Sequence, residues 1–277
     1  MKQIHRCQPL LGTFVELLLQ ADEAEDYLLQ LSQVVFAEIR RIHHMMSFHD
    51  VDSALTYINT HAYQQDCVIS PDLQAVLGLA INLSEQTNGA FDISVAPKLV
   101  QKNLLPNHHL DVDLTANWEN IQLGKGSVRF SKKLQLDLGG IAKGYAVDRG
   151  LSLIPDHVRG IINAGGDVGM THWQEETIEV RDPLNHHQSF HAIKMRAPAV
   201  ATSAGYFNED GQVAIMHPTK TDKVLPLSAT VFANTVMLAD ALTKVVFLQQ
   251  DCIALLQDCS AQAFYVDGDG NQHWISQ

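Results

Sequence analysis

The sequence predicts a globular protein of mixed helices and strands over its 277 residues. Two patterns support this prediction. Short apolar stretches in which every second residue is polar recur along the chain, as in half-buried strands. Longer stretches between them place apolar residues three or four positions apart, as in amphipathic helices. The composition, 46% hydrophobic and 18% charged, is ordinary for a globular enzyme, and a chain of this length buries one large core or two modest ones.

The N-terminal third is predicted to contain a strand and two helices. The strand covers Gly12 to Gln20. The first helix has Asp22 as its cap and Glu25 three residues later, and its apolar face consists of Leu28, Leu31, Val35, Ile39 and Ile42. After an irregular segment at 46–53, a second helix begins at Ser70-Pro71 and ends at Asn88-Gly89. Residues 89–95 then form a C-cap and a short strand.

The rest of the chain is predicted to alternate strands with two helices. Residues 102–117 are polar, have little pattern and form a surface excursion. Helices are expected at 145–154 and 235–247. Strands are expected at 127–131, around Leu134 and Leu136, and at 159–163, 177–180, 190–195 and 229–232, with two more within 262–274. The turn between the last two is Asp267 to Gly270; its aspartates resemble a calcium loop only in part, so a hairpin turn is favoured.

Net charge, cysteine spacing and the N-terminal segment each argue against certain classes of protein. The net charge of -12 argues against nucleic acid or an anionic membrane as the main partner. The four cysteines show no CxxC spacing and are interpreted as free thiols. The chain as given shows neither a signal-peptide pattern nor a stretch of transmembrane length, so we expect a cytoplasmic protein, or a periplasmic one if the chain is a processed form.

The stretch from Asp137 to Asp148, DLGGIAKGYAVD, is the strongest local motif. A glycine pair between an apolar stretch and a helix lets the backbone approach a ligand and directs free N–H groups at it, which suits a phosphate or a diphosphate. A structural turn is the simpler interpretation of this motif alone. The stretch is neither a Walker loop, because Lys143 precedes Gly144, nor a G-x-G-x-x-G dinucleotide fingerprint. A second glycine pair, Gly165-Gly166, also follows a predicted strand and favours the ligand-binding interpretation.

The ordered set of motifs resembles the ApbE family, the FAD:protein FMN transferases that were formerly called thiamine biosynthesis lipoproteins. The resemblance extends from Leu11 to Phe247. Single motifs are moderately specific, and their order is highly specific. In chain order they are Gly12-Thr13; Met46-Ser47 with Asp52-Ser53 and Asn59; Gly89-Ala90-Phe91-Asp92; the central stretch; Asn163-Ala164-Gly165-Gly166-Asp167; Ala201-Thr202-Ser203; and Ala239-Asp240-Ala241-Leu242.

The resemblance implies a single ApbE-like domain over residues 1–277, with an α+β fold related to the T-fold. It implies antiparallel sheets, flanking helices and two lobes that close on an FAD cleft. It implies an enzyme that cleaves the diphosphate of FAD with Mg²⁺ and joins FMN by a phosphoester to a Thr or Ser of a target protein. Two alternatives stay open: a magnesium-dependent FAD pyrophosphatase and a non-catalytic FAD-binding protein. A solute-binding or structural role without flavin is a more remote alternative.

The resemblance also implies roles for individual residues. Asp240 and His217 are the predicted catalytic residues, and Asp240, the carbonyl of Ala142 and Thr243 are the predicted magnesium ligands. The residues predicted to contact FAD are Thr13, Ser53, Phe91, Asp92, Gly139, Gly140, Lys143, Gly165, Gly166 and Asp167. Simpler interpretations are open for four of them: Lys143 as a surface lysine, Phe91 as core, and Thr13 and Ser53 as local caps.

Three departures from the family pattern bear on these roles. Ala214 stands where relatives have the histidine proposed as the base, and His217, three residues later, is the candidate replacement or a loop histidine without a role. Lys244 stands four residues after Asp240, where the family has a metal-side Thr, and Thr243 stands three after it. Because residues four apart share a helix face, an ammonium could replace the charge of the metal. Ala204 is inserted between Ser203 and Gly205.

Overall fold

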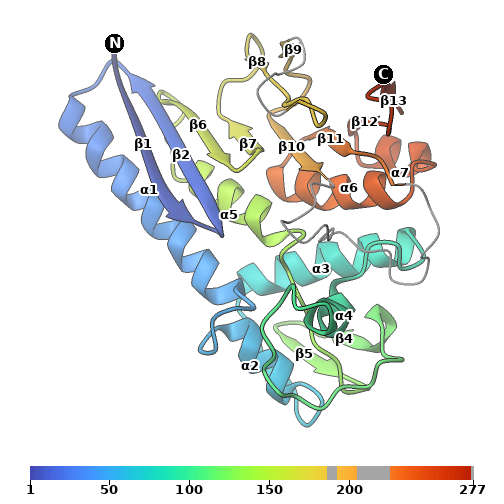
Figure 1. Ribbon diagram of the computed structural model, residues 1–277. Coiled ribbons are helices and arrows are strands. Elements are labelled where there is room, and N and C mark those ends of the chain that lie inside the picture. Colours follow the sequence, from blue (N-terminus) through green and yellow to red (C-terminus); the bar gives the residue numbers. More distant parts are fainter. Residues whose placement is uncertain (186–191, 205–224, 276–277) are drawn as a thin grey trace. The chain divides into compact units, whose positions relative to one another are not determined.

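The computed structural model describes residues 1–185, 192–204 and 225–275 (Figure 1). The chain forms two compact units. The first unit is built from residues 1–41 and from the described residues after 142, and the second unit comprises residues 42–142. Each unit has secondary structure of its own, and the single domain over residues 1–277 stays a prediction.

An eight-stranded antiparallel sheet forms the first unit, in the order β1-β2-β6-β7-β10-β11-β12-β13. The strands are β1 Lys2–Leu10, β2 Thr13–Ala21, β6 Arg159–Ala164, β7 Asp167–Met170, β10 Ala199–Ala204, β11 Ser228–Ala233, β12 Gln262–Val266 and β13 Gln272–Trp274. In the register, Val15 faces Ala164 and Val200 faces Val168. The N-terminal strands β1 and β2 therefore lie at one edge of the sheet and the C-terminal strands at the other, and β6 and β7 join them. The expected antiparallel α+β fold is confirmed.

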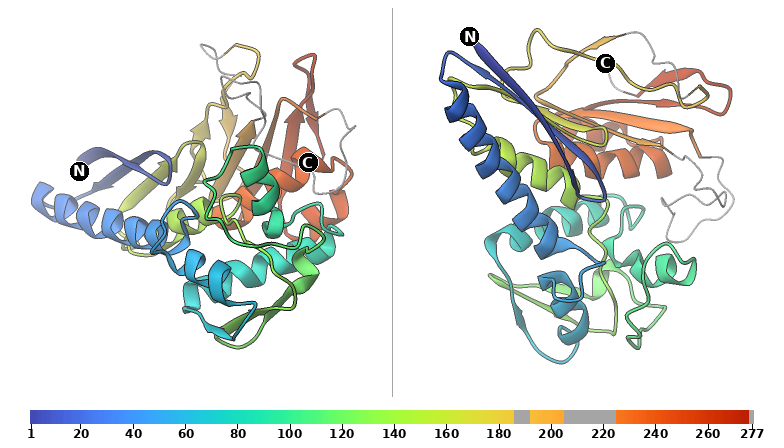
Figure 2. Two further views of the ribbon diagram at one scale, coloured as in Figure 1. Left: turned by 60° about the horizontal axis from the view of Figure 1, so that its bottom comes forward. Right: turned by 60° about the vertical axis from the view of Figure 1, so that its left-hand side comes forward.

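Helices cover one face of this sheet (Figures 1 and 2). They are α1 Glu25–Met46, which continues into the second unit, α5 Ala142–Leu151 and α6 Val236–Leu248, followed by the short α7 Ile253–Asp258. Alternate residues of β2, namely Val15, Leu17 and Leu19, are completely buried on the helix side. Phe14, on the other face, has 67% of its surface exposed. The two faces of the sheet therefore have different environments.

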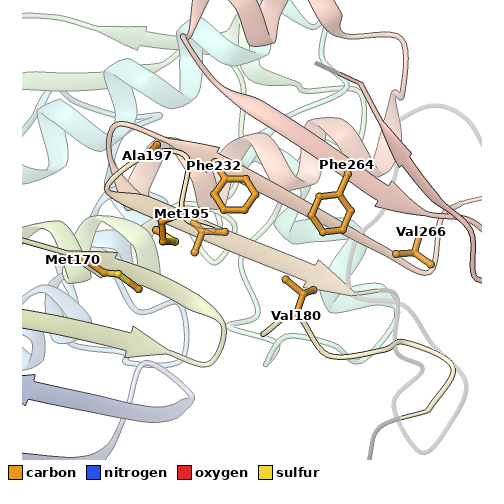
Figure 3. Close-up of a cluster of buried hydrophobic side chains, with 8 residues drawn as sticks. Met170, Val180, Met195, Ala197, Phe232, Phe264 and Val266 are labelled. Atoms are coloured by element: carbon orange, nitrogen blue, oxygen red, sulfur yellow. The ribbon is translucent and has the colours of Figure 1, made fainter. Parts of the chain in front are cut away.

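A smaller apolar cluster covers part of the opposite face (Figure 3). The segment that carries β8 (Thr177–Ile178) and β9 (Ile193–Lys194) contributes Val180 and Met195, which pack with Phe232 of β11 and Phe264 of β12. This segment lies over β10 and β11 but leaves the region near β2 and β6 open, where a cavity remains.

The second unit contains three α-helices, α2 Ala54–His61, α3 Pro71–Gln86 and α4 Ala96–Gln101, the 3-10 turns η1 Ile93–Val95 and η2 Trp118–Asn120, and a sheet in the order β3-β5-β4. Its strands are β3 Cys67–Val68, β4 Ile121–Leu123 and β5 Ser127–Phe130. The predicted start of α3 is confirmed, because the Ser70 hydroxyl accepts a hydrogen bond from the N–H of Leu73 and Pro71 occupies the first turn.

Several predicted elements differ from the observed ones. Several observed elements were not predicted, namely strands β1, β3, β4, β7 and β10 and helices α2, α4 and α7. Helix α1 begins at Glu25, three residues after Asp22, so Asp22 is not its cap. Residues 89–95 form a turn and η1 instead of a strand, because the Asp92 carboxylate accepts the N–H of Ser94 at 2.7 Å and caps that turn.

The apolar stretch before the first glycine pair is not a strand either. The side-chain amide of Asn59 pairs with the backbone of Leu136 in both directions: its oxygen accepts the Leu136 N–H at 2.7 Å and its nitrogen donates to the Leu136 carbonyl at 3.0 Å. A side chain thus supplies the hydrogen bonds that a neighbouring strand would otherwise make. Leu134, Leu136 and Leu138 are buried, which explains their strand-like pattern.

Three further predictions concern the cysteines, the last turn and membrane-spanning segments. All four cysteines are free thiols, as predicted. The turn at Asp267 is a hairpin turn, in which that carboxylate accepts the N–H groups of Asp269 and Asn271. Among the described residues, no helix has the length and apolar character needed to cross a membrane.

Candidate functional site

The hairpin that joins β6 to β7 brings a glycine pair close to the start of β2. Gly165 has a φ of +67° and Gly166 a φ of +102°, conformations that side chains disfavour. A Cβ added to Gly165 would lie 2.6 Å from the Thr13 hydroxyl, and the Asn163 side chain accepts the Gly166 N–H at 2.9 Å. Glycine is therefore required at this turn both by backbone conformation and by the close approach of Thr13.

A cavity of about 690 Å³ opens beside this hairpin, on the face of the sheet away from the helices. Thr13, Gly165, Gly166 and Thr202 line one part of it, and Phe14 lines another. The volume lies within the range of cavities that hold small ligands and cofactors. The remaining lining residues come from β1, β2, β6, β7, β10, β8 and the segment after β8: His5, Glu16, Leu18, Ile161, Asn163, Val168, Ile178, Glu179, Val180, Arg181, Val200 and Ala204.

Asp167, directly after the glycine pair, points to the other face of the sheet. Its carboxylate is almost completely buried and is paired with the ammonium of Lys143, in the first turn of α5. The same ammonium lies 3.5 Å from Oδ1 of Asp240, in α6. Three side chains that are distant in the sequence therefore form one buried ionic cluster on the helix side of the hairpin.

Lys244 completes this cluster from the next turn of α6. Its ammonium pairs with Oδ1 of Asp240 and donates to the Asp240 carbonyl at 2.9 Å. Its side chain is 16% exposed, and that of Asp240 is not exposed at all. The ionic cluster, defined as Lys143, Asp167, Asp240 and Lys244, thus holds two ammonium groups and two carboxylates, and its formal charges cancel.

Close packing of two helix N-termini positions Asp240. The N–H of Gly144 donates to Oδ2 of Asp240 at 3.1 Å, and a Cβ added to Gly144 would lie 2.3 Å from the carbonyl oxygen of Val236. Asp148, one turn further along α5, accepts the N–H groups of Val236 and Met237 at 2.8 Å each. The side chain of one helix therefore caps the other helix and aligns the carboxylate of Asp240 with the start of α5.

The environment shifts the pKa values of the buried groups in opposite directions. Burial acts to lower the pKa of Lys143, but the attraction of Asp167 and Asp240 is stronger and holds it above its ordinary value. Burial acts to raise the pKa of Asp240, yet Lys143 and Lys244 hold it below its ordinary value. For Asp167, burial and the neighbouring charge of Asp240 win, and the pKa is raised.

The chain belongs to a known family. The ApbE family matches residues 11–265. This is an ApbE family protein. The chain is similar to the FAD:protein FMN transferase of Treponema pallidum, with 23% identity over 97% of this chain and 85% of the relative. The FAD:protein FMN transferase of Vibrio cholerae is 25% identical over 87% of this chain and 80% of the relative. The crystal structure of the ApbE protein from Thermotoga maritima has a TM-score of 0.87 and 25% identity, covering 100% of this chain and 97% of that one.

Six of the residues predicted from the ApbE motifs lie in the two neighbouring features of the first unit. Thr13, Gly165 and Gly166 line the cavity, and Lys143, Asp167 and Asp240 form most of the ionic cluster. The cavity and the cluster approach the β6–β7 hairpin from its two faces, because neighbouring residues of a strand point to opposite sides. Lys143 is a partner of two carboxylates, which argues against the surface-lysine interpretation.

Other predicted residues have structural partners in the second unit. Ser53 caps α2 through the N–H of Thr56, Phe91 is buried in the core with 5% exposure, and Asp92 caps η1. Gly139 lies in the turn before α5 without a left-handed φ, and its N–H is bonded to Asp137; Gly140 follows it in the same turn. These contacts account for the residues without a ligand, and their predicted contacts with FAD stay predictions.

The predicted magnesium ligands do not form a free set of oxygen donors. Both carboxylate oxygens of Asp240 are engaged, one by two ammonium groups and the other by the Gly144 N–H. The Thr243 hydroxyl donates to the Asp240 carbonyl at 2.6 Å and pairs with Ser203. Ala142 is the first residue of α5. Within the described ranges, no three His, Cys, Asp or Glu side chains are arranged to hold a metal ion. This donor set does not fit Mg²⁺, which needs oxygen ligands with free lone pairs.

Asp148 is a site residue that the sequence did not predict, and His217 is a predicted one that the structure does not describe. Asp148 was not predicted as a site residue, although it closes the central motif; its role in capping α6 depends on a contact 88 residues away in the sequence. His217, the predicted base, and Ala214 lie outside the described residues, so the role of His217 stays a prediction.

Proposed function

We propose that this ApbE family protein is an FAD:protein FMN transferase. The observation that supports the proposal most strongly is the convergence of the family motifs in the first unit. Four separate parts of the chain meet at the β6–β7 hairpin. They are Thr13, the glycine pair Gly165-Gly166 of the hairpin itself, Lys143 and Asp240. Both curated relatives carry the name FAD:protein FMN transferase.

The proposed reaction is an in-line displacement at the phosphorus of the FMN half of FAD. The hydroxyl oxygen of a Thr or Ser on the acceptor protein forms a new bond to this phosphorus. The bond from the phosphorus to the bridging oxygen breaks, and AMP leaves with that oxygen. The hydroxyl proton passes to a base, for which His217 is the candidate. Such a reaction requires a positioned nucleophile and positive charge at the diphosphate.

Residues of the first unit supply these requirements in the proposal. The Lys143 side chain is 31% exposed, so its ammonium can meet a phosphate oxygen while it remains close to Asp167. Gly166, whose added Cβ would meet only the Thr202 carbonyl at 3.8 Å, leaves room for a diphosphate at the hairpin. In the proposal the adjacent cavity accepts an aromatic part of the dinucleotide. The donor set around Asp240 does not support the magnesium implied by the family resemblance, and the proposed displacement is described without it.

Incubation of the purified protein with FAD and candidate acceptor proteins tests the proposal. The acceptor is expected to gain the mass of one FMN joined through a phosphoester, with release of one AMP per acceptor. An acceptor in which the target Thr or Ser is replaced by Ala is the control and should gain no mass. Release of AMP and FMN without acceptor labelling would instead indicate an FAD pyrophosphatase. FAD that is bound but never cleaved would indicate a binding protein.

A further inference from the structure

The ionic cluster contains a second ammonium group, although one ammonium already contacts both carboxylates. Lys143 alone can pair with Asp167 and also reach Asp240, at 3.5 Å. Lys244 is nevertheless added from the next helical turn, and it contacts Asp240 twice, at the carboxylate and at the carbonyl. A second ammonium at a completely buried carboxylate has a specific electrostatic effect, because it supplies the positive charge that a bound cation would otherwise supply.

Each oxygen of Asp240 already has a hydrogen-bond or ammonium partner among the described residues. Oδ1 is shared by the two ammonium groups, Oδ2 accepts the Gly144 N–H, and the carbonyl accepts from both Lys244 and Thr243. A divalent cation at Asp240 would have to displace Lys244 and would stand beside Lys143, which carries a like charge. The two carboxylates of the cluster are already balanced by two ammonium groups.

We infer that Lys244 serves as a built-in counter-ion of Asp240 and that this protein binds FAD without a divalent cation. The inference deepens the proposed function and rests on it, since it concerns the cofactor requirement of the same site. Lys244 is a positioning residue here. It neutralises the charge of Asp240 and holds that carboxylate in place. Asp240 therefore continues to accept the Gly144 N–H at the start of α5. Lys143, which lies 3.5 Å from Asp240, is then the ammonium that meets the diphosphate.

Two measurements on the full chain test this inference. The first is the affinity for FAD, measured by calorimetry or by quenching of flavin fluorescence, in excess EDTA and in millimolar Mg²⁺. The wild-type protein should bind FAD equally in both solutions, within about twofold. The second is direct binding of Mn²⁺, followed by electron paramagnetic resonance without FAD. Mn²⁺ binding at Asp240 would be recognised by its loss in Asp240→Asn. The wild-type protein should show no such binding.

Substitution of Lys244 should convert the site. In Lys244→Thr, Oδ1 of Asp240 loses its closer ammonium partner and keeps only the contact with Lys143 at 3.5 Å. Mn²⁺ should then bind at least about tenfold more tightly than to the wild-type protein, with FAD binding now stronger in Mg²⁺ than in EDTA. Lys244→Arg keeps the charge and should behave like the wild type, which separates loss of the ammonium from loss of the fold. Lys194→Thr, at an exposed lysine of β9 paired with Glu175, is the matched control for a change of net charge.

The outcomes distinguish this inference from the proposed function. Wild-type FAD binding that weakens more than about tenfold in EDTA would overturn the inference and leave the transferase proposal standing. A folded Lys244→Thr protein that gains no Mn²⁺ affinity would also overturn it. Absence of FAD binding in both solutions would count against the proposed function, and the inference would fail with it.

Discussion

At the scale of single residues, burial decides what each charged side chain can do. Asp240 and Asp167 are almost completely excluded from water, and each is paired with an ammonium group. An unpaired charge at such positions would destabilise the fold strongly. Asp148 differs from both, because the partners described for its carboxylate are two backbone N–H groups at the start of α6. Burial raises its pKa, and no ammonium group opposes that shift in these contacts.

Asp148 should make stability depend on pH in a defined direction. Burial raises the pKa of Asp148 to about 6, even though the N–H groups of Met237 and Val236 oppose this shift. The folded protein therefore holds a proton that the unfolded chain has lost between pH 4 and pH 6, and the free energy of unfolding contributed by this group falls as the pH rises through that window. We expect a fall of about 2 kcal/mol relative to Asp148→Asn, which lacks this titration.

Urea unfolding of both proteins at pH 4 and at pH 6.5 measures this difference. Asp251→Asn, at an exposed position, is the control, and its profile should run parallel to that of the wild type. Parallel profiles for wild type and Asp148→Asn, or a difference of opposite sign, would show that the Asp148 carboxylate is not protonated preferentially in the fold.

At the scale of elements, the site depends on close approaches that only glycine allows. The N-terminal turns of α5 and α6 touch at Gly144, and the β6–β7 hairpin touches β2 at Gly165. The sequence predicted both glycine pairs as special, and it predicted α3, α5 and α6 within a few residues. It did not show which backbone each glycine approaches, because those contacts join segments far apart in the chain. For the same reason Leu134 and Leu136 suggested a strand.

Gly144→Ala should destabilise the protein, because the new Cβ would lie 2.3 Å from the Val236 carbonyl oxygen, a backbone atom that cannot rotate away. We expect a loss of about 3 kcal/mol in the free energy of unfolding. Gly78→Ala is the matched control, since Gly78 also lies in a helix and its added Cβ meets only Leu123 at 3.9 Å. That substitution should stabilise the protein slightly, by about 0.5 kcal/mol. Equal effects in urea unfolding would contradict the proposed contact.

The hairpin glycines allow a second comparison. Both have a positive φ, so Gly165→Ala and Gly166→Ala should each cost about 1 kcal/mol in backbone strain. Only the Cβ at position 165 also meets Thr13, at 2.6 Å, whereas the one at 166 meets the Thr202 carbonyl at 3.8 Å. Gly165→Ala should therefore cost more, and Thr13→Ala should restore part of that loss in the double variant. Additive effects of the two substitutions would exclude the contact between them.

At the scale of the whole molecule, an antiparallel sheet collects the family motifs from distant parts of the sequence. β2 from the N-terminal region pairs with β6 from the middle, and β10 pairs with both β7 and β11. This order places Thr13, the Gly165-Gly166 hairpin, Lys143 and Asp240 in one unit. Sequence reasoning identified these residues because the motifs are ordered as in the ApbE family. The spacing of Lys244 and Asp240 predicted an ammonium beside that carboxylate, and this pair is observed. The addition of Lys143 and Asp167 to a neutral ionic cluster could not be predicted, because it depends on side-chain positions in three dimensions.

A crystal structure of the protein with FAD tests the central claim most directly. We expect the diphosphate to lie at the β6–β7 hairpin within contact of the Lys143 ammonium, and Lys244 to remain paired with Asp240. A structure in which FAD binds elsewhere, while Lys143 stays enclosed between Asp167 and Asp240, would contradict the account.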